Sequence, residues 1–211
     1  MINLIRLEFL KLRKKTRSWL GPIIVFLLIM IAYPLTVEFL QEKLEIGFFS
    51  VLWIAILISM MLATEDIFTE DFNDGFLELM VIQNSSFSLG VSIKVFAYWF
   101  LIGFPVSFLG FIFSYGTTGN FSLSISIFPL ALISSYIFLN LFALGNSLSL
   151  NKGSVLGAIV TMPLALPVLI VLGKSLTALQ LDINFLSFIL LLLGSLSLSL
   201  IHISEPTRHE S

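Results

Sequence analysis

Acidic and phenylalanine side chains are interleaved in one polar stretch of the chain, residues 64–94. Phe68, Phe72 and Phe76 recur at every fourth position, a spacing that brings side chains onto one face of a helix. The pattern predicts a short amphipathic helix near 64–73, ended by Gly75, and a second helix near 76–82. Six of the thirteen acidic residues of the chain lie in this stretch: Glu65, Asp66, Glu70, Asp71, Asp74 and Glu78.

Two chemical roles for these carboxylates fail on sequence grounds. A calcium loop that begins at Asp71 needs an oxygen ligand at position 75 and glycine at position 76, where this chain has Gly75 and Phe76. A catalytic pair of carboxylates needs a desolvated environment, which acids in a solvated loop do not have. We therefore expect neither a metal site nor a catalytic site in this segment.

A solvated connector and a docking helix for a cytoplasmic partner remain as interpretations of the segment. The phenylalanines favour the docking helix, because apolar rings at helical spacing need a surface to bury them. The residues assigned to this contact are Phe68, Asp71, Phe72, Asp74, Gly75, Phe76 and Glu78.

Other motifs give no support for catalysis or for a bound cofactor. The chain has no cysteine, and His202 and His209 have no second ligand at metal spacing. Residues 173–175 read Gly-Lys-Ser, but a nucleotide-binding loop needs glycine at position 168, where this chain has Val168. We therefore expect a protein that is not an enzyme and binds no cofactor directly, so that any ATP is hydrolysed by a partner chain.

Pro163 and Pro167 lie four positions apart within one apolar stretch. Each removes a backbone donor from the same side of a helix, so the helix is predicted to bend there. A hinge in a moving transporter and a static kink both fit this pattern, and both interpretations stay open.

The rest of the chain is strongly apolar. Hydrophobic residues make up 57% and charged residues only 11%, against roughly a quarter charged in soluble domains. Soluble and nucleic-acid-binding folds are thereby excluded, and apolar runs without polar alternation exclude a membrane β-barrel. We predict a single all-α membrane domain, residues 1–203, with six transmembrane helices free of Asp, Glu, Lys and Arg: 19–37, 46–63, 95–115, 121–145, 154–173 and 185–203.

Basic residues set the predicted orientation. Residues 1–18 hold six of the eleven lysines and arginines, and positive loops stay in the cytoplasm. Both termini and the segment 64–94 are therefore predicted to be cytoplasmic. Residues 1–18 also carry an apolar stripe that predicts an amphipathic helix in the membrane interface, although a basic signal that only sets topology would look the same.

Several motifs resemble the haem exporter protein B (CcmB) family, the membrane subunit of bacterial cytochrome c maturation, over residues 3–195. The acidic loop at 71–78 matches an acidic-Gly-x-Leu-Glu signature of that family, although Asn73 and Phe76 depart from it. Tyr98 stands where the family often has histidine, so no role of that histidine is carried over. The other matching segments are 33–35, 51–53, 65–68, 94–99 and 163–170.

The resemblance implies an ABC-2-type permease in the bacterial inner membrane, which acts in haem delivery together with a separate cytoplasmic ATPase. It implies a homodimer or a mixed pair of membrane subunits, and contacts with other cytochrome c maturation proteins. It also implies a coupling helix between spans two and three, within 64–94, and haem as a handled or transported ligand. A non-transporting scaffold and an ATP-independent carrier are the alternatives. The tail, residues 204–211, resembles translated adapter sequence and is predicted to be non-native.

Overall fold

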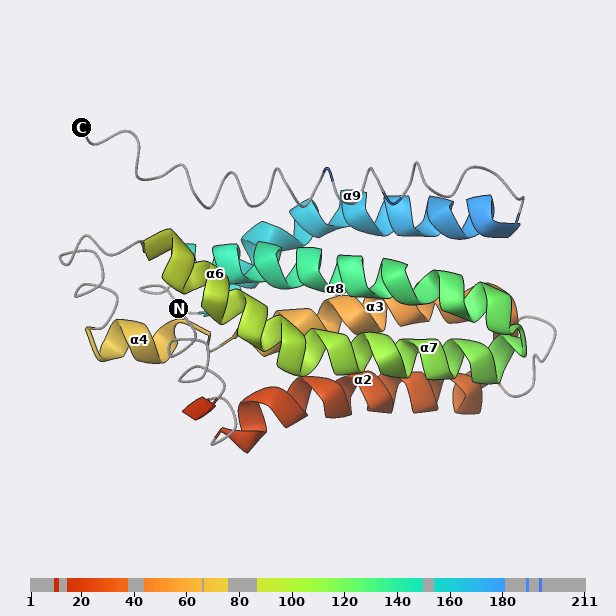
Figure 1. Ribbon diagram of the computed structural model, residues 1–211, viewed down its shortest axis with the longest axis horizontal. Coiled ribbons are helices and arrows are strands. Elements are labelled where there is room, and N and C mark those ends of the chain that lie inside the picture. Colours follow the sequence, from red (N-terminus) through yellow and green to blue (C-terminus); the bar gives the residue numbers. More distant parts are fainter. Residues whose placement is uncertain are drawn as a thin grey trace.

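A computed structural model describes residues 10–11, 15–37, 44–65, 67–75, 87–149, 154–180, 189 and 194, and its regular elements are helices. Figure 1 shows most of them side by side along the long axis of the molecule, with α4 at one end. Their bounds are α2 Thr16–Val37, α3 Leu44–Thr64, α4 Thr69–Asn73, α6 Phe87–Tyr98, η2 Trp99–Gly103, α7 Phe104–Thr118, α8 Phe121–Leu148 and α9 Ser154–Gln180.

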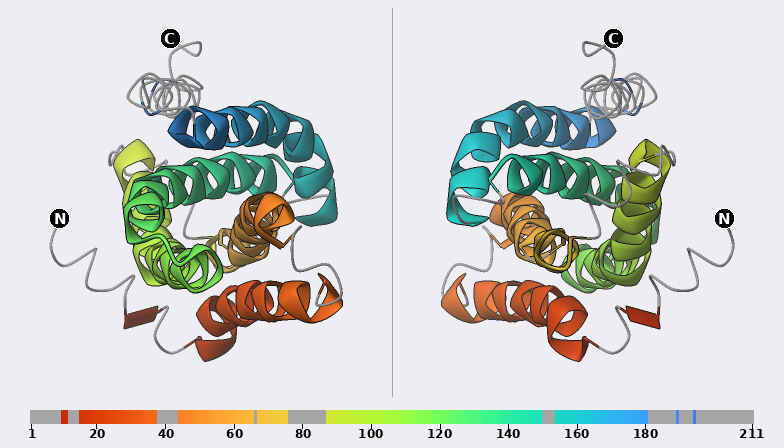
Figure 2. Two further views of the ribbon diagram at one scale, coloured as in Figure 1. Left: turned by 90° about the vertical axis from the view of Figure 1, so that its right-hand side faces the viewer. Right: turned by 90° about the vertical axis from the view of Figure 1, so that its left-hand side faces the viewer.

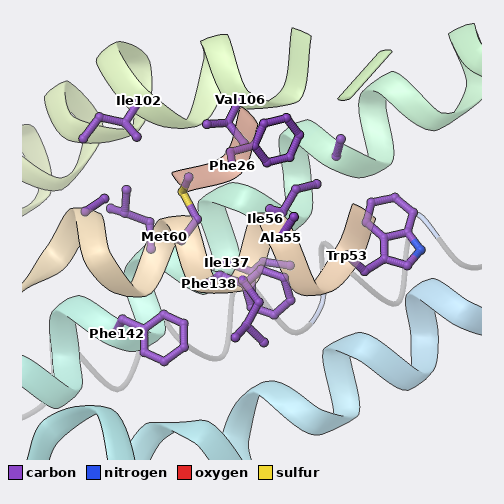
Figure 3. Packing of buried hydrophobic residues seen from close by; sticks show 14 of the residues in the cluster. Phe26, Trp53, Ala55, Ile56, Met60, Ile102, Val106, Ile137, Phe138 and Phe142 are labelled. Carbon is purple, nitrogen blue, oxygen red and sulfur yellow. The ribbon is translucent and has the colours of Figure 1, made fainter. Parts of the chain in front are cut away.

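Helix α3 lies at the centre of the bundle. It packs against α2 and α8 most extensively and also contacts α7 and α9, and Figure 2 shows it enclosed by these helices in the end-on views. Its residues Leu52, Ile56 and Met60 are fully buried. Figure 3 shows side chains of the neighbouring helices, including Phe26 and Phe138, gathered around this segment. The bundle core is therefore built on the second apolar stretch of the sequence.

Four helical stretches are long and apolar enough to cross a membrane: Ser18–Thr36, Gly47–Asn73, Gly90–Thr118 and Phe121–Ser147. They cover most of each of the first four predicted spans, but Gly47–Asn73 runs on to the end of α4 and Gly90–Thr118 begins five residues before the predicted span. The fifth predicted span lies in α9, where the apolar part Thr161–Thr177 is shorter. The sixth, 185–203, and most of the predicted interfacial helix, 1–18, lie outside the described residues.

The third stretch is interrupted by a π-helix, η2, which the sequence analysis did not predict. Pro105 follows two residues after η2 and has no N–H for the carbonyl one turn earlier. The wider turn lets the Trp99 indole reach α8, where its Nε1–H donates to the Ser135 hydroxyl at 3.0 Å. A Cβ built on Gly103 would lie 2.5 Å from Trp99 Cδ1, so glycine leaves room for the indole. The indole donor thus has a partner in an apolar region.

A turn of two residues joins α7 and α8. Gly119 has a φ of +63°, a conformation that glycine adopts without cost, and its N–H donates to the Tyr115 carbonyl. Asn120 caps α8, because its side chain accepts a hydrogen bond from the Leu123 N–H at 3.2 Å. These two residues make α7 and α8 antiparallel neighbours.

Helix α9 continues through Pro163 and Pro167, both of which are exposed. Figure 2 shows a change of direction in the first half of α9. Near its start, α9 meets α8 backbone to backbone: a Cβ on Gly157 would lie 2.5 Å from the Gly145 carbonyl oxygen. The bend and the close crossing lie near the end of the bundle that carries α4 (Figure 1).

Candidate docking site at the charged end of the bundle

Charged residues gather at one end of the described bundle. Figure 1 shows α4 there, together with the beginnings of α2 and α6. The N-terminal segment reaches the same place, because Lys15 forms an ion pair with Glu70 of α4. This end holds the residues that the sequence analysis assigned to docking, as far as the structure describes them. Phe76 and Glu78 lie outside the described residues.

The position of α4 follows from how α3 ends. Thr64, the last residue of α3, donates its hydroxyl back to the Met61 carbonyl at 2.9 Å. The Thr64 carbonyl accepts bonds from the Ile67 N–H at 3.1 Å and from the buried Asn146 side chain at 2.7 Å. These two donors take the place of the backbone N–H that a continuing helix would supply to the Thr64 carbonyl. The chain turns at 65–68 before α4 begins. The predicted helix near 64–73 is therefore divided at this turn, because polar groups within the chain satisfy the end of α3.

Gly75 ends α4 as predicted. Its φ of +69° is left-handed, and its N–H donates to the Phe72 carbonyl at 3.1 Å. The Asp74 N–H donates to the Glu70 carbonyl at 2.8 Å, which closes the last helical turn. A glycine just beyond the cap is the usual stop for a helix, since a Cβ would be strained in this conformation.

The inner side of this segment is buried and contains a paired charge. Ile67, Phe68 and Asp71 are each less than a tenth exposed. Asp71 forms an ion pair with Lys94 of α6, which is itself 9% exposed. The Lys94 ammonium also lies 5.9 Å from the centroid of the Phe68 ring. Pairing is what allows these two charges to lie away from water.

The outer side of α4 faces away from the bundle. Glu70, Asn73 and Asp74 are exposed, and the Phe72 side chain is 38% exposed. Glu70 pairs with Lys15, and Asp71 receives a second cation, Lys11, at 3.7 Å. The half-exposed Phe72 ring beside the exposed Asp74 carboxylate forms a surface that suits a partner with an apolar pocket and cations around it.

The structure separates residues that the sequence analysis grouped together. Phe68 and Phe72 were expected on one face of a helix, but Phe68 precedes α4 and is buried, whereas Phe72 is exposed. Phe68 is the N-cap of α4 and its carbonyl accepts a hydrogen bond from the Phe72 N–H at 2.9 Å, so the fourfold spacing alone did not predict which of the two rings is buried. Phe68 and Asp71 thus lie on the side that attaches α4, and Phe72 and Asp74 on the side available to a partner.

Sequence reasoning missed the cations that hold α4. Lys94 was considered only as the first residue of the matching segment 94–99, and Lys11 and Lys15 only as part of the basic segment 1–18. The signal in the sequence was that Lys94 directly precedes the apolar span 95–115, where an unpaired charge is costly. Within the described ranges there is no group of three or more His, Cys, Asp or Glu residues placed to hold a metal ion.

Comparison with known proteins places the chain in a family. The chain matches the family described as CcmB protein over residues 1–206. It is 27% identical to heme exporter protein B of Haemophilus influenzae, over 87% of this chain and 84% of that protein. It is 29% identical to heme exporter protein B of Pseudomonas aeruginosa, over 75% of this chain and 72% of that protein. The chain therefore belongs to the CcmB family.

Proposed function

We propose that the chain is the membrane permease subunit of an ABC transporter complex that acts in haem delivery for c-type cytochrome biogenesis. ATP is hydrolysed by a separate cytoplasmic subunit, and this chain contributes no catalytic residue. Membership of the CcmB family and the helices long enough to cross a membrane support this role. The haem itself is a handled or transported ligand, not a resident cofactor.

The observation that carries the proposal is the two-sided α4. One side is fixed to the bundle through Phe68 and Asp71, and the other presents Phe72 and Asp74 outward. A short helix fixed in this way at the end of a membrane bundle can receive force from a protein that docks on it. We propose that the docked protein is the ATPase.

The remaining architecture follows from the same proposal. The chain crosses the bacterial inner membrane six times with both termini in the cytoplasm, and residues 64–94 form the cytoplasmic coupling segment. Two copies, or this chain with a second membrane subunit, assemble around the ATPase and contact other cytochrome c maturation proteins. In this proposal, the site of ATP hydrolysis and the path through the membrane lie in separate polypeptides.

Replacing Phe72 by Ala together with Asp74 by Lys tests the docking claim. The double variant removes the exposed ring and reverses a charge, so we expect recovery of the ATPase with the purified membrane subunit to fall by about tenfold or more. Insertion into the membrane should be unchanged, because both side chains point away from the bundle.

A matched control is Phe108→Ala in α7, which removes a ring that is also about half exposed but lies on the membrane-spanning part. It should leave ATPase recovery at the native level. Equal recovery with the native chain and with the Phe72 and Asp74 double variant would remove the docking claim.

A further inference from the structure

We infer that Lys94 is the positioning residue of α4: its ion pair with Asp71 fixes α4 to the start of the third membrane stretch. The inference rests on the proposed function, in which a docked ATPase displaces α4. It adds a route for that displacement, from α4 through a single pair of charges to α6.

Burial distinguishes Lys94 from the other cations around α4. The Lys94 side chain is 11% exposed and lies against Asp71, whereas Lys11, which approaches the same carboxylate at 3.7 Å, is 53% exposed. An exposed pair contributes little because water screens it and its side chain is mobile. A buried pair is costly to break, since removal of one partner leaves the other charge in a poorly solvated place. Lys94 is therefore the cation that fixes the position of Asp71.

The connections of α4 along the chain do not by themselves link it to α6, so the ion pair between Asp71 and Lys94 has a role to fill. The turn at 65–68 joins α4 to α3, and Asn146 joins the end of α3 to α8. Neither connection involves α6. Among the contacts given for the described residues, the Lys94 side chain supplies the link, through Asp71 and the Phe68 ring.

Lys94 also lies close to the irregular part of the third stretch. η2 begins at Trp99, about one and a half helical turns further along. A π-helix is rare and often lies at a functional site. A movement of α6 imposed through Lys94 therefore reaches η2 and the Trp99–Ser135 bond to α8.

A distance measurement tests this role directly. The chain has no cysteine, so Asn73→Cys on α4 and Phe96→Cys on α6 would carry the only two spin labels. Both positions are exposed. In an otherwise native chain we expect one narrow distance, because α4 and α6 form one unit. In Lys94→Gln and in Asp71→Asn we expect this narrow distance to be lost and replaced by a broad distribution.

Two further variants separate positioning from general effects of charge. Lys11→Gln removes a cation from the same carboxylate at an exposed position, and it should keep the narrow distance. The reversed pair, Asp71→Lys with Lys94→Glu, should restore it. A narrow distance in both Lys94→Gln and Asp71→Asn would overturn the inference, as would equal broadening in Lys11→Gln. Failure of both single variants and of the reversed pair to accumulate would also overturn it, by making the pair a requirement for folding.

The ATPase is then added to distinguish this inference from the proposed function. Lys94→Gln should still bind the ATPase, because Phe72 and Asp74 remain in place, while cytochrome c maturation falls about tenfold or more. If the ATPase does not bind even the native chain, the proposed function fails, and the distances measured without ATPase still decide whether Lys94 positions α4. Native maturation in Lys94→Gln would overturn the inferred route.

Discussion

Gly145 and Gly157 allow the backbones of α8 and α9 to touch at the charged end of the bundle. A Cβ on Gly157 would lie 2.5 Å from the Gly145 carbonyl oxygen and 2.6 Å from the Ser149 hydroxyl. Small residues at such a crossing are the usual means by which membrane helices approach closely, since lipid provides no hydrophobic force between them. This crossing fixes the beginning of α9 against the same helix that holds the end of α3.

Gly157→Ala is expected to lower the stability of the protein in detergent by about 1–3 kcal/mol, because a methyl group there meets backbone atoms that cannot rotate away. The melting temperature measures the loss. Gly173→Ala in the same helix is the matched control, since nothing lies within 4 Å of its Cβ position. It should leave the melting temperature unchanged or slightly higher. Equal melting temperatures for the two variants would contradict the crossing as described.

Individual residues at the docking site could be predicted only in part. The acid and phenylalanine pattern located the segment, and Gly75 marked the end of its helix. Phe68 follows the end of α3, where the Thr64 carbonyl is bonded by Asn146, a residue 82 positions away. Helical spacing carries no information about such a distant partner. The pairing of Lys94 with Asp71 depends on the same tertiary arrangement.

The bounds of the helices show which features of secondary structure could be predicted from the local sequence. The apolar stretches for α2, α3 and α8 were located from hydrophobicity alone, because a membrane helix must satisfy its backbone internally. The π-helix at Trp99–Gly103 was not predicted, although Pro105 lies close by. A proline removes one hydrogen bond, but packing decides whether the helix kinks or widens, and here the indole of Trp99 bonds to α8.

The prolines of α9 lead to a prediction at the scale of the element. Pro163 and Pro167 are both exposed, so alanine at both positions restores two backbone donors without disturbing the core. If α9 works as a hinge, we expect cytochrome c maturation to fall several-fold while ATPase recovery stays native. Maturation at the native level would favour a static kink, and with it the scaffold alternative.

The whole molecule is polarised along its long axis. Its described apolar helices form the length of the bundle, and Lys11, Lys15, Glu70, Asp71 and Lys94 gather at one end (Figure 1). The sequence predicted this division, because residues without charge form the spans and the charged segments are few. It did not predict that the basic N-terminal segment and the acidic segment meet, since charge counts set orientation and carry no information about pairing.

Accessibility of position 73 tests the central claim most directly, that α4 is a cytoplasmic surface for an ATPase. Asn73→Cys should react with a membrane-impermeant thiol reagent in inverted vesicles and not in intact spheroplasts, and bound ATPase should block the reaction. Ser122→Cys, exposed at the opposite end of the bundle, should show the reverse sidedness and no protection. Labelling of position 73 in intact spheroplasts, or equal labelling with and without the ATPase, would contradict the account.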